Sequence, residues 1–321
     1  MSASKRENII QSIADSYIER ELFSGIEWIA EKSGKVVLSG KSGYQNFEEK
    51  TPIPASAIYR IYSMTKPITS VMALKLIEEG KLRLYDLVSS FIPSFENLKV
   101  MNPDGSTEDL ERPMIIEDLL THRSGLTYDF LPGCHVAPLY SEKDISDDGS
   151  VNLEEKCESL SRLPLAYQPG SRFNYSVSID VLARIIEVIS EKDFEEILKE
   201  EIFEPLDMKD TGFSVKEKNL PRLMSTYGAS NFKEIMNIGP HNLKETNVNQ
   251  HNPYLKGDHF RRGGTGLFST ISDYLSFGRM LLTGKSKSGK IILSRNMIKF
   301  MRVNRIPDPQ LPIMLGPLPF S

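Results

Sequence analysis

The chain has 321 residues, of which 40% are hydrophobic and 26% charged, values close to the average for soluble globular proteins. Its formal net charge of −4 excludes the strongly basic surface that nucleic-acid binding requires, so we expect no nucleic-acid partner. The sequence has neither an uncharged apolar run of about 18 residues nor an N-terminal secretory signal, which predicts a cytoplasmic protein without a membrane partner.

The first 80 residues predict a helix, a hairpin and a second helix. Apolar residues recur at helical spacing between residues 5 and 23. Two alternating runs, residues 25–30 and 35–40, flank a glycine-containing turn and predict a β-hairpin. A short strand-like run, Tyr59–Tyr62, then precedes a long helix that we expect to end at Gly80.

From about residue 85 to 255 the apolar periodicity is mostly helical. The clearest helix is 176–190, and the next, 193–208, should stop at Pro205. Residues 129–150 and 230–260 are two stretches that we interpret as long loops.

The C-terminal part predicts two capped helices and little sheet. Thr270 and Asp273 form a capping-box pattern, and Ser294 should cap a helix that follows it. The proline-rich end after residue 304 is unsuited to a central strand. The histidines and the two cysteines, Cys134 and Cys157, lack metal-ligand spacing, so we expect free thiols, no metal and no cofactor.

A serine followed three residues later by a lysine occurs three times, at Ser2, Ser63 and Ser230. Only Ser63 lies between a strand-like run and a helix, where Lys66 shares its face and can reach its hydroxyl. The positive end of the helix also favours an activated serine. The alternative is that Ser63 caps the helix and Lys66 points to solvent.

Tyr175 follows a Pro-Gly turn and directly precedes a helix. Beside an ammonium group its hydroxyl could be drawn towards the phenolate and serve as a base or an acid. The alternative is a half-buried core tyrosine bonded to backbone. His122 is expected to have a structural role, and Arg261 and Arg262 to be solvated.

Five ordered blocks of the sequence resemble the serine β-lactamase and penicillin-binding-protein superfamily, and most of all its class C-like carboxylesterases. The resemblance implies an α+β fold with an antiparallel sheet flanked by helices and an all-helical region. It implies a single domain over 1–321, with an α/β region of about 1–65 and 260–321 and a helical region of about 66–259. The blocks are SMTKPITSVMALKLIEEGKLRLYDLVSSFIPSF, IEDLLTHRSGLTY, YQPGSRFNYSVSIDVLARIIEVIS, IFEPLDMKDTGF and GGTGLFSTISDYLSFGRML.

The same resemblance implies roles for the three candidate residues. Ser63 would be the acylated nucleophile, Lys66 its general base and Tyr175 the second proton carrier. Class C enzymes have Tyr-x-Asn where this chain has Val177 as the third residue, and losing that amide favours esters over β-lactams. We therefore expect a serine hydrolase acting on small carboxylic esters, with a β-lactamase or D-amino-acid peptidase as the alternative.

The superfamily's third motif, a Lys/His/Trp-x-Gly triplet on a strand beside the site, has no match after residue 303. That strand would supply the second oxyanion donor, and losing one such donor typically costs about 10²–10³ in rate. The expectation is either a shortened chain or a sheet completed in another way. A non-catalytic fold used for binding is therefore a further alternative.

Overall fold

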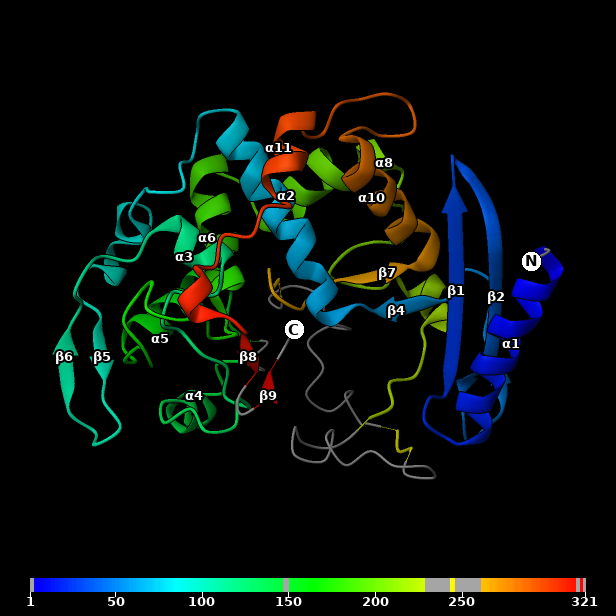
Figure 1. The fold of residues 1–321 in the computed structure, drawn as a ribbon, viewed down its shortest axis with the longest axis horizontal. Coiled ribbons are helices and arrows are strands. Elements are labelled where there is room, and N and C mark those ends of the chain that lie inside the picture. The colour runs from blue at the N-terminus through cyan, green and yellow to red at the C-terminus, as the bar shows by residue number, and fades with distance from the viewer. Residues whose placement is uncertain (1–2, 147–149, 229–242, 246–260, 316–317, 320–321) are drawn as a thin grey trace.

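The computed structural model describes residues 3–146, 150–228, 243–245, 261–315 and 318–319. Figure 1 shows an N-terminal sheet beside a larger, mainly helical body. The α-helices are α1 (Ala3–Glu19), α2 (Thr65–Glu78), α3 (Ile116–Leu120), α4 (Ala137–Glu142), α5 (Leu153–Ser161), α6 (Ser178–Ser190), α7 (Phe194–Leu198), α8 (Glu204–Leu206), α10 (Ile271–Thr283) and α11 (Arg295–Phe300). The 3-10 turns are η1 (Tyr62–Met64), η2 (Val88–Ser90), η3 (Pro93–Phe95), η5 (Glu217–Arg222) and η7 (Asp308–Gln310), and η4 (Lys199–Phe203) is a π-turn.

All described strands pair antiparallel, but they do not form one continuous sheet. One sheet has the order β1-β2-β3, and three separate pairs are β4-β7, β5-β6 and β8-β9. The strands are β1 (Gly25–Lys32), β2 (Lys35–Asn46), β3 (Thr51–Pro52), β4 (Ile58–Arg60), β5 (Lys99–Met101), β6 (Thr107–Asp109), β7 (Phe268–Thr270), β8 (Met314–Leu315) and β9 (Leu318–Pro319).

The N-terminal helix and hairpin agree with the sequence prediction. Strands β1 and β2 pair from Gly25↔Gly43 to Lys32↔Lys35. Ser33 and Gly34 both have positive φ, as a two-residue hairpin turn requires. Helix α1 packs against β2, and α10 packs against β1 on the side of the main body (Figure 1).

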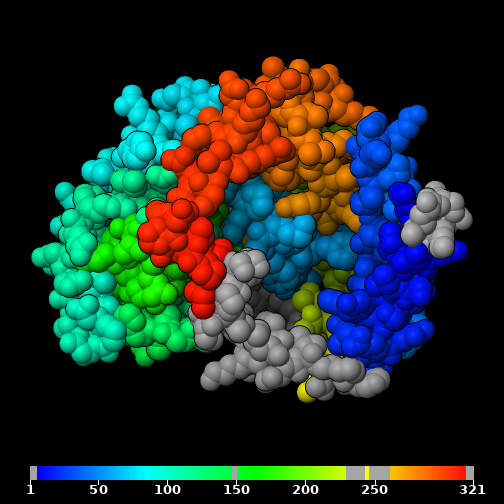
Figure 2. All heavy atoms as spheres, in the orientation of Figure 1, coloured from blue at the N-terminus to red at the C-terminus, as the bar shows by residue number. Residues whose placement is uncertain are grey.

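A groove of about 960 Å³ separates β1 from the β4-β7 pair. Among the described residues, the edge of β1 that faces away from β2 has no strand partner. The groove is lined mainly by apolar and aromatic side chains of β1, β4 and α10. In the space-filling view, light-blue atoms of β4 and the start of α2 lie in a hollow between the dark-blue N-terminal elements and the orange-red C-terminal ones (Figure 2).

Helices α2 and α6 form the centre of the main apolar core. Helix α6 buries Ile179, Leu182 and Ile186, as its periodicity predicts, and α2 packs against it. Helix α2 ends at Glu78, followed by Gly80 with positive φ, so the predicted end is confirmed. No described helix is long and apolar enough to cross a membrane.

Three local predictions need correction. Residues 99–109, in the stretch read as mostly helical, form the β5-β6 hairpin. Residues 137–142, predicted as loop, form α4. Pro205 does not stop its helix directly, because a π-turn over 199–203 precedes it and the chain turns left-handed only at Asp207. Most of the predicted 230–260 loop, and the alternative serines Ser2 and Ser230, lie outside the described residues.

The segment 263–267 ties the start of α2 to the rest of the protein. The N–H of Ile61 donates to the Leu267 carbonyl at 3.0 Å. The N–H of Leu267 in turn donates to Thr65 Oγ1 at 3.2 Å, and Thr69 Oγ1 donates to the Gly263 carbonyl at 2.7 Å. The first turn of α2 is therefore fixed by contacts with residues about 200 positions away in the sequence.

We predict that Gly263→Ala destabilises the protein by about 1–3 kcal/mol, the usual cost of overpacking a core. An added Cβ would lie 2.5 Å from the Ile179 carbonyl oxygen and 2.7 Å from Ala183 Cβ, so α6 would have to shift. Urea unfolding measures the change. The matched control is Gly278→Ala in α10, where a Cβ meets nothing within 4 Å and should stabilise by about 0.5–1 kcal/mol. Equal effects at the two positions would contradict this packing.

Candidate active site

Ser63 lies in the tight turn η1 between β4 and α2. The preceding residue, Tyr62, has a φ of +42°, an uncommon conformation for a large side chain that is often found near functional sites. The Ser63 side chain is exposed and makes no capping bond, since the cap position of α2 is Met64. Among the described residues, the Ser63 N–H makes no backbone hydrogen bond outside its own turn. The capping alternative is therefore wrong, and this N–H can donate to a ligand.

Lys66 is buried beneath Ser63, with 9% of its surface exposed. Its Nζ donates to Ser63 Oγ at 3.2 Å, to Tyr128 Oη at 3.1 Å and to the Gly264 carbonyl at 2.9 Å. These bonds use all three N–H groups of an ammonium. The alternative in which Lys66 points to solvent is wrong.

The burial of Lys66 changes its protonation. Desolvation lowers the pKa of Lys66 to about 8, although the negative charge of Asp180 opposes this shift. A lysine with that pKa is neutral in about one molecule in ten at pH 7, whereas an ordinary lysine is almost never neutral there. Lys66 can therefore accept a proton from Ser63 near physiological pH.

Tyr175 completes the contact with Ser63. Its Oη lies 2.6 Å from Ser63 Oγ, and its ring centroid lies 4.6 Å from Lys66 Nζ. Burial raises the pKa of Tyr175, and the hydrogen bond with Ser63 only partly offsets this. The expectation that Tyr175 is drawn towards the phenolate is therefore wrong for this state. Its hydroxyl is a proton donor at neutral pH.

His122 holds the segment that carries Tyr175. Its Nδ1 accepts from the Ser176 N–H at 3.3 Å, and its carbonyl accepts from the Asn174 N–H at 2.7 Å. The imidazole also packs on the Tyr175 ring, with centroids 4.9 Å apart. Burial, together with the nearby charge of Lys66, lowers the pKa of His122 to about 3. The ring is neutral, and its bonds to backbone groups fit the structural role that the sequence predicts.

Sequence reasoning missed several residues around Lys66. Tyr128 and Gly264 contact the lysine directly, and Asp180 accepts the Gly264 N–H at 2.7 Å. The prediction that Arg262 is solvated is wrong, because its side chain is fully buried. One signal was readable: Asp180 stands in an otherwise apolar stretch of α6, where a buried carboxylate needs a partner.

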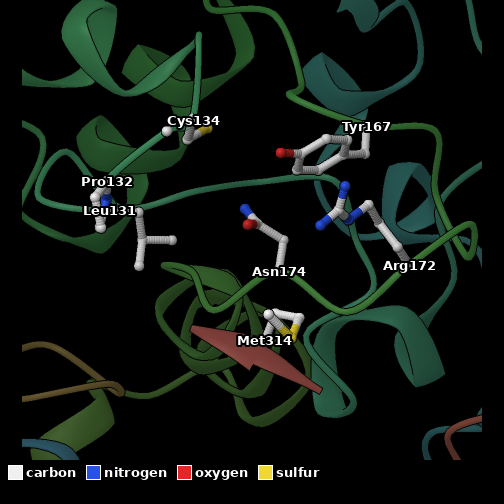
Figure 3. Close-up of a pocket in the computed structure, with 8 residues that line it drawn as sticks. Leu131, Pro132, Cys134, Tyr167, Arg172, Asn174 and Met314 are labelled. Carbon is white, nitrogen blue, oxygen red and sulfur yellow. The ribbon is translucent and has the colours of Figure 1, made fainter. Parts of the chain in front are cut away.

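Three hollows are lined by residues of the site or by their neighbours in the chain. The groove beside β1 reaches Tyr62 and Met64, and a cavity of about 460 Å³ is lined by Lys66, His122 and residues of α2, α3 and 300–306. A third cavity of about 320 Å³ contains Asn174 and Arg172, whose guanidinium lies 4.3 Å from the Tyr167 ring centroid (Figure 3). Among the described residues, no group of three or more His, Cys, Asp or Glu side chains is arranged to hold a metal ion.

A comparison with known protein families shows which family the chain belongs to. The sequence matches the Beta-lactamase family over residues 10–316. The chain belongs to the beta-lactamase family. It is 32% identical over 295 residues to the uncharacterized protein MT1414 of Mycobacterium tuberculosis, covering 90% of this chain and 70% of that protein. It is 29% identical over 207 residues to the esterase EstB of Burkholderia gladioli, covering 64% of this chain and 50% of EstB.

Solved structures of the beta-lactamase fold agree with this membership. EstCE1, described as a hydrolase with promiscuous acyltransferase activity, superposes with a TM-score of 0.75 at 26% identity. The match covers 92% of this chain and 75% of EstCE1. Unliganded simvastatin synthase from Aspergillus terreus gives a TM-score of 0.70 at 21% identity, covering 95% of this chain and 73% of that one, and shows the shared fold. This beta-lactamase family member thus has relatives among serine hydrolases, including esterases.

We predict that His122 makes the protein less stable as the pH falls below about 6.5. In the folded state His122 stays neutral down to its pKa of about 3, whereas in the unfolded chain it binds a proton below its ordinary pKa of 6.5. Between these two pH values the unfolded chain binds more protons, so acidification stabilises the unfolded state relative to the folded state. Urea unfolding at pH 7 and pH 5.5 should show that wild type loses about 1 kcal/mol more than His122→Asn over this interval. The same pH dependence in both proteins would contradict a neutral, buried imidazole.

Proposed function

We propose that this protein is a serine hydrolase that cleaves small carboxylic esters through an acyl-enzyme on Ser63. The observation that carries the proposal is that Ser63 Oγ contacts both Lys66 Nζ, at 3.2 Å, and Tyr175 Oη, at 2.6 Å. A nucleophile bonded to a base with a lowered pKa and to a separate acid is the arrangement that covalent catalysis needs. The exposed side chain of Ser63 leaves room for a substrate carbonyl.

Acylation can be written with these three residues. Neutral Lys66 takes the proton of Ser63 as Oγ bonds to the ester carbonyl carbon. The Ser63 N–H stabilises the oxyanion of the tetrahedral intermediate. When the bond to the alcohol oxygen breaks, Tyr175 gives its proton to that oxygen, and the proton held by Lys66 restores the tyrosine. The products are the free alcohol and an acyl group on Ser63.

In deacylation water is the nucleophile and Ser63 is the leaving group. Neutral Lys66 accepts a proton from the attacking water as the new bond to the acyl carbon forms. The bond from this carbon to Ser63 Oγ then breaks, and Lys66 returns the proton to Oγ across the 3.2 Å hydrogen bond. The carboxylic acid leaves, and the serine, lysine and tyrosine are in their starting states.

Esters are favoured over β-lactams by the residues that follow Tyr175. Val177 and Ser176 are both fully buried, and Ser176 Oγ bonds Ser178 Oγ at 2.6 Å. Neither position offers an amide to a substrate's amide side chain, so a β-lactam would lose that recognition. The esterase EstB and the hydrolase EstCE1 among the relatives point in the same direction.

We predict that Ser63→Ala lowers kcat/KM for p-nitrophenyl butyrate by about 10⁴-fold or more, because the acyl-enzyme cannot form. Tyr175→Phe should lower kcat/KM for an alkyl ester, ethyl butyrate, by about 10²–10⁴-fold, since the leaving alcohol loses its acid, and should cost less with the nitrophenyl ester, because nitrophenolate leaves without a proton. The measurements are the release of nitrophenolate and of butyric acid by purified variants.

The matched control is Ser230→Ala, which removes the serine of another Ser-x-x-Lys sequence and should keep full activity. Nitrocefin, assayed beside the ester, separates an esterase from a β-lactamase. Full ester hydrolysis by Ser63→Ala would end this proposal. No hydrolysis of either substrate by the wild type would favour a non-catalytic fold.

We predict that kcat/KM for the ester rises with pH through about 8 and then levels off. The base must be neutral, and Lys66 loses its proton with a pKa of about 8. Tyr175, whose pKa is raised above its ordinary value of 10.0, stays protonated throughout this range, so no fall is expected below pH 10. A buffered pH series from 6 to 10 checks the midpoint. Activity that is flat from pH 6 upwards would exclude Lys66 as the titrating base.

A further inference from the structure

A cluster of charged side chains lies wholly inside the protein behind Lys66. Asp180, Lys156 and Arg262 are each no more than 2% exposed. Asp180 Oδ2 lies 2.9 Å from Lys156 Nζ, and Arg262 Nη2 donates to the Val151 carbonyl at 3.0 Å. Burial alone would raise the pKa of Asp180, but the charges of Lys156 and Arg262 outweigh it and hold this pKa below its ordinary value. The carboxylate is therefore ionised.

Stability alone does not explain this cluster. Replacing a buried ion pair by apolar side chains of similar size is often neutral or stabilising, because desolvation offsets the attraction between the charges. Burial also lowers the pKa of Lys156, so the attraction of Asp180 does not fully offset the cost of burying this ammonium group. Such a cluster beside a reactive lysine calls for another explanation.

One glycine connects the cluster to Lys66. The N–H of Gly264 donates to Asp180 Oδ1 at 2.7 Å, and the carbonyl of the same residue accepts from Lys66 Nζ at 2.9 Å. A Cβ on Gly264 would lie 3.1 Å from Asp180 Oδ1, 3.1 Å from Tyr128 Oη and 3.5 Å from Lys66 Nζ. All three polar atoms thus converge on the place where a side chain would be. The carboxylate and the ammonium lie within about 7 Å of each other.

We propose that Asp180 is a positioning residue for Lys66. It fixes the Gly264 carbonyl that holds the lysine towards Ser63, and its charge stabilises the ammonium form. Lys156 and Arg262 keep Asp180 ionised and in place. The expected effect of Asp180 on the reaction rate rests on the proposed ester hydrolysis. Its effect on the pKa of Lys66 does not, because that pKa can be measured without any substrate.

The negative charge that acts on Lys66 comes from Asp180. Among the described residues, Asp180 is the acidic group whose charge acts on Lys66. His122 is neutral, and the two tyrosines that contact Lys66 present hydroxyls and rings. Removing the negative charge destabilises the ammonium, so the pKa of Lys66 should fall. The charged or titratable groups around this lysine are Ser63, His122, Tyr128, Tyr175 and Asp180, with Lys156 and Arg262 behind them.

The test compares Asp180→Asn, which keeps the shape, with the double variant Asp180→Asn/Lys156→Met. The single variant leaves Lys156 buried without its carboxylate and could fail to fold, whereas the double variant removes the unpaired charge as well. Two readouts are needed. One is the titration of the Lys66 side chain by NMR, and the other is kcat, KM and the pH profile of ester hydrolysis.

In the folded variant, we expect the pKa of Lys66 and the midpoint of the pH profile to move down by about one unit. The plateau kcat should fall by about 10–100-fold, since the lysine is held less firmly, with KM unchanged. The control is Asp118→Asn, which removes a buried aspartate paired with Arg112 at 2.8 Å and should leave both midpoints in place.

A Lys66 titration that does not move in the variant would overturn the proposal, whether or not esters are hydrolysed. A downward shift in a protein that cleaves no ester would support the role of Asp180 and count only against the proposed function. A lower kcat with an unchanged Lys66 titration would show that Asp180 is structural, and would also overturn the proposal.

Discussion

The burial of one ammonium group organises the candidate site. Lys66 lies almost out of contact with water, and an isolated charge in that position would be strongly unfavourable. The protein compensates with three acceptors from three different parts of the chain: Ser63, Tyr128 and the carbonyl of Gly264. The compensation is incomplete, because the pKa of Lys66 remains lowered to about 8. Incomplete compensation is what makes a lysine useful as a base near neutral pH.

The packing around Lys66 is also arranged by the burial of its ammonium group. Lys66 lies in the first turn of α2, and Ser63 lies in the turn η1 directly before this helix, so the lysine side chain can reach the serine hydroxyl. The segment 263–267 must approach α2 and α6 closely to place a carbonyl on Nζ, which is why Gly263 has no room for a side chain. His122 fixes the tyrosine segment from the other side without adding a charge. Tyr175 and Lys66 therefore contact Ser63 from two separately supported segments of the chain.

Local signals were sufficient to predict a large part of the fold. The hairpin of β1 and β2, the extents of α2 and α6, and the caps at Thr270 and Ser294 followed from periodicity and capping residues. Predictions that depended on longer-range contacts were less accurate. Residues 99–109 became a hairpin and Arg262 became buried, because tertiary packing overrides weak local preferences.

The sequence by itself determined the family, the fold class and the candidate residues Ser63, Lys66 and Tyr175, because their motifs are local and ordered along the chain. Only the tertiary structure decided what those residues contact. Whether Ser63 caps a helix or faces a base, whether Lys66 is solvated, and whether Tyr175 keeps its proton all depend on burial and on partners far away in sequence. Tyr128, Asp180 and Gly264 have no local signature that links them to Lys66. They act on it because folding removes water from the space they share, and electrostatic interactions become strong where water is excluded.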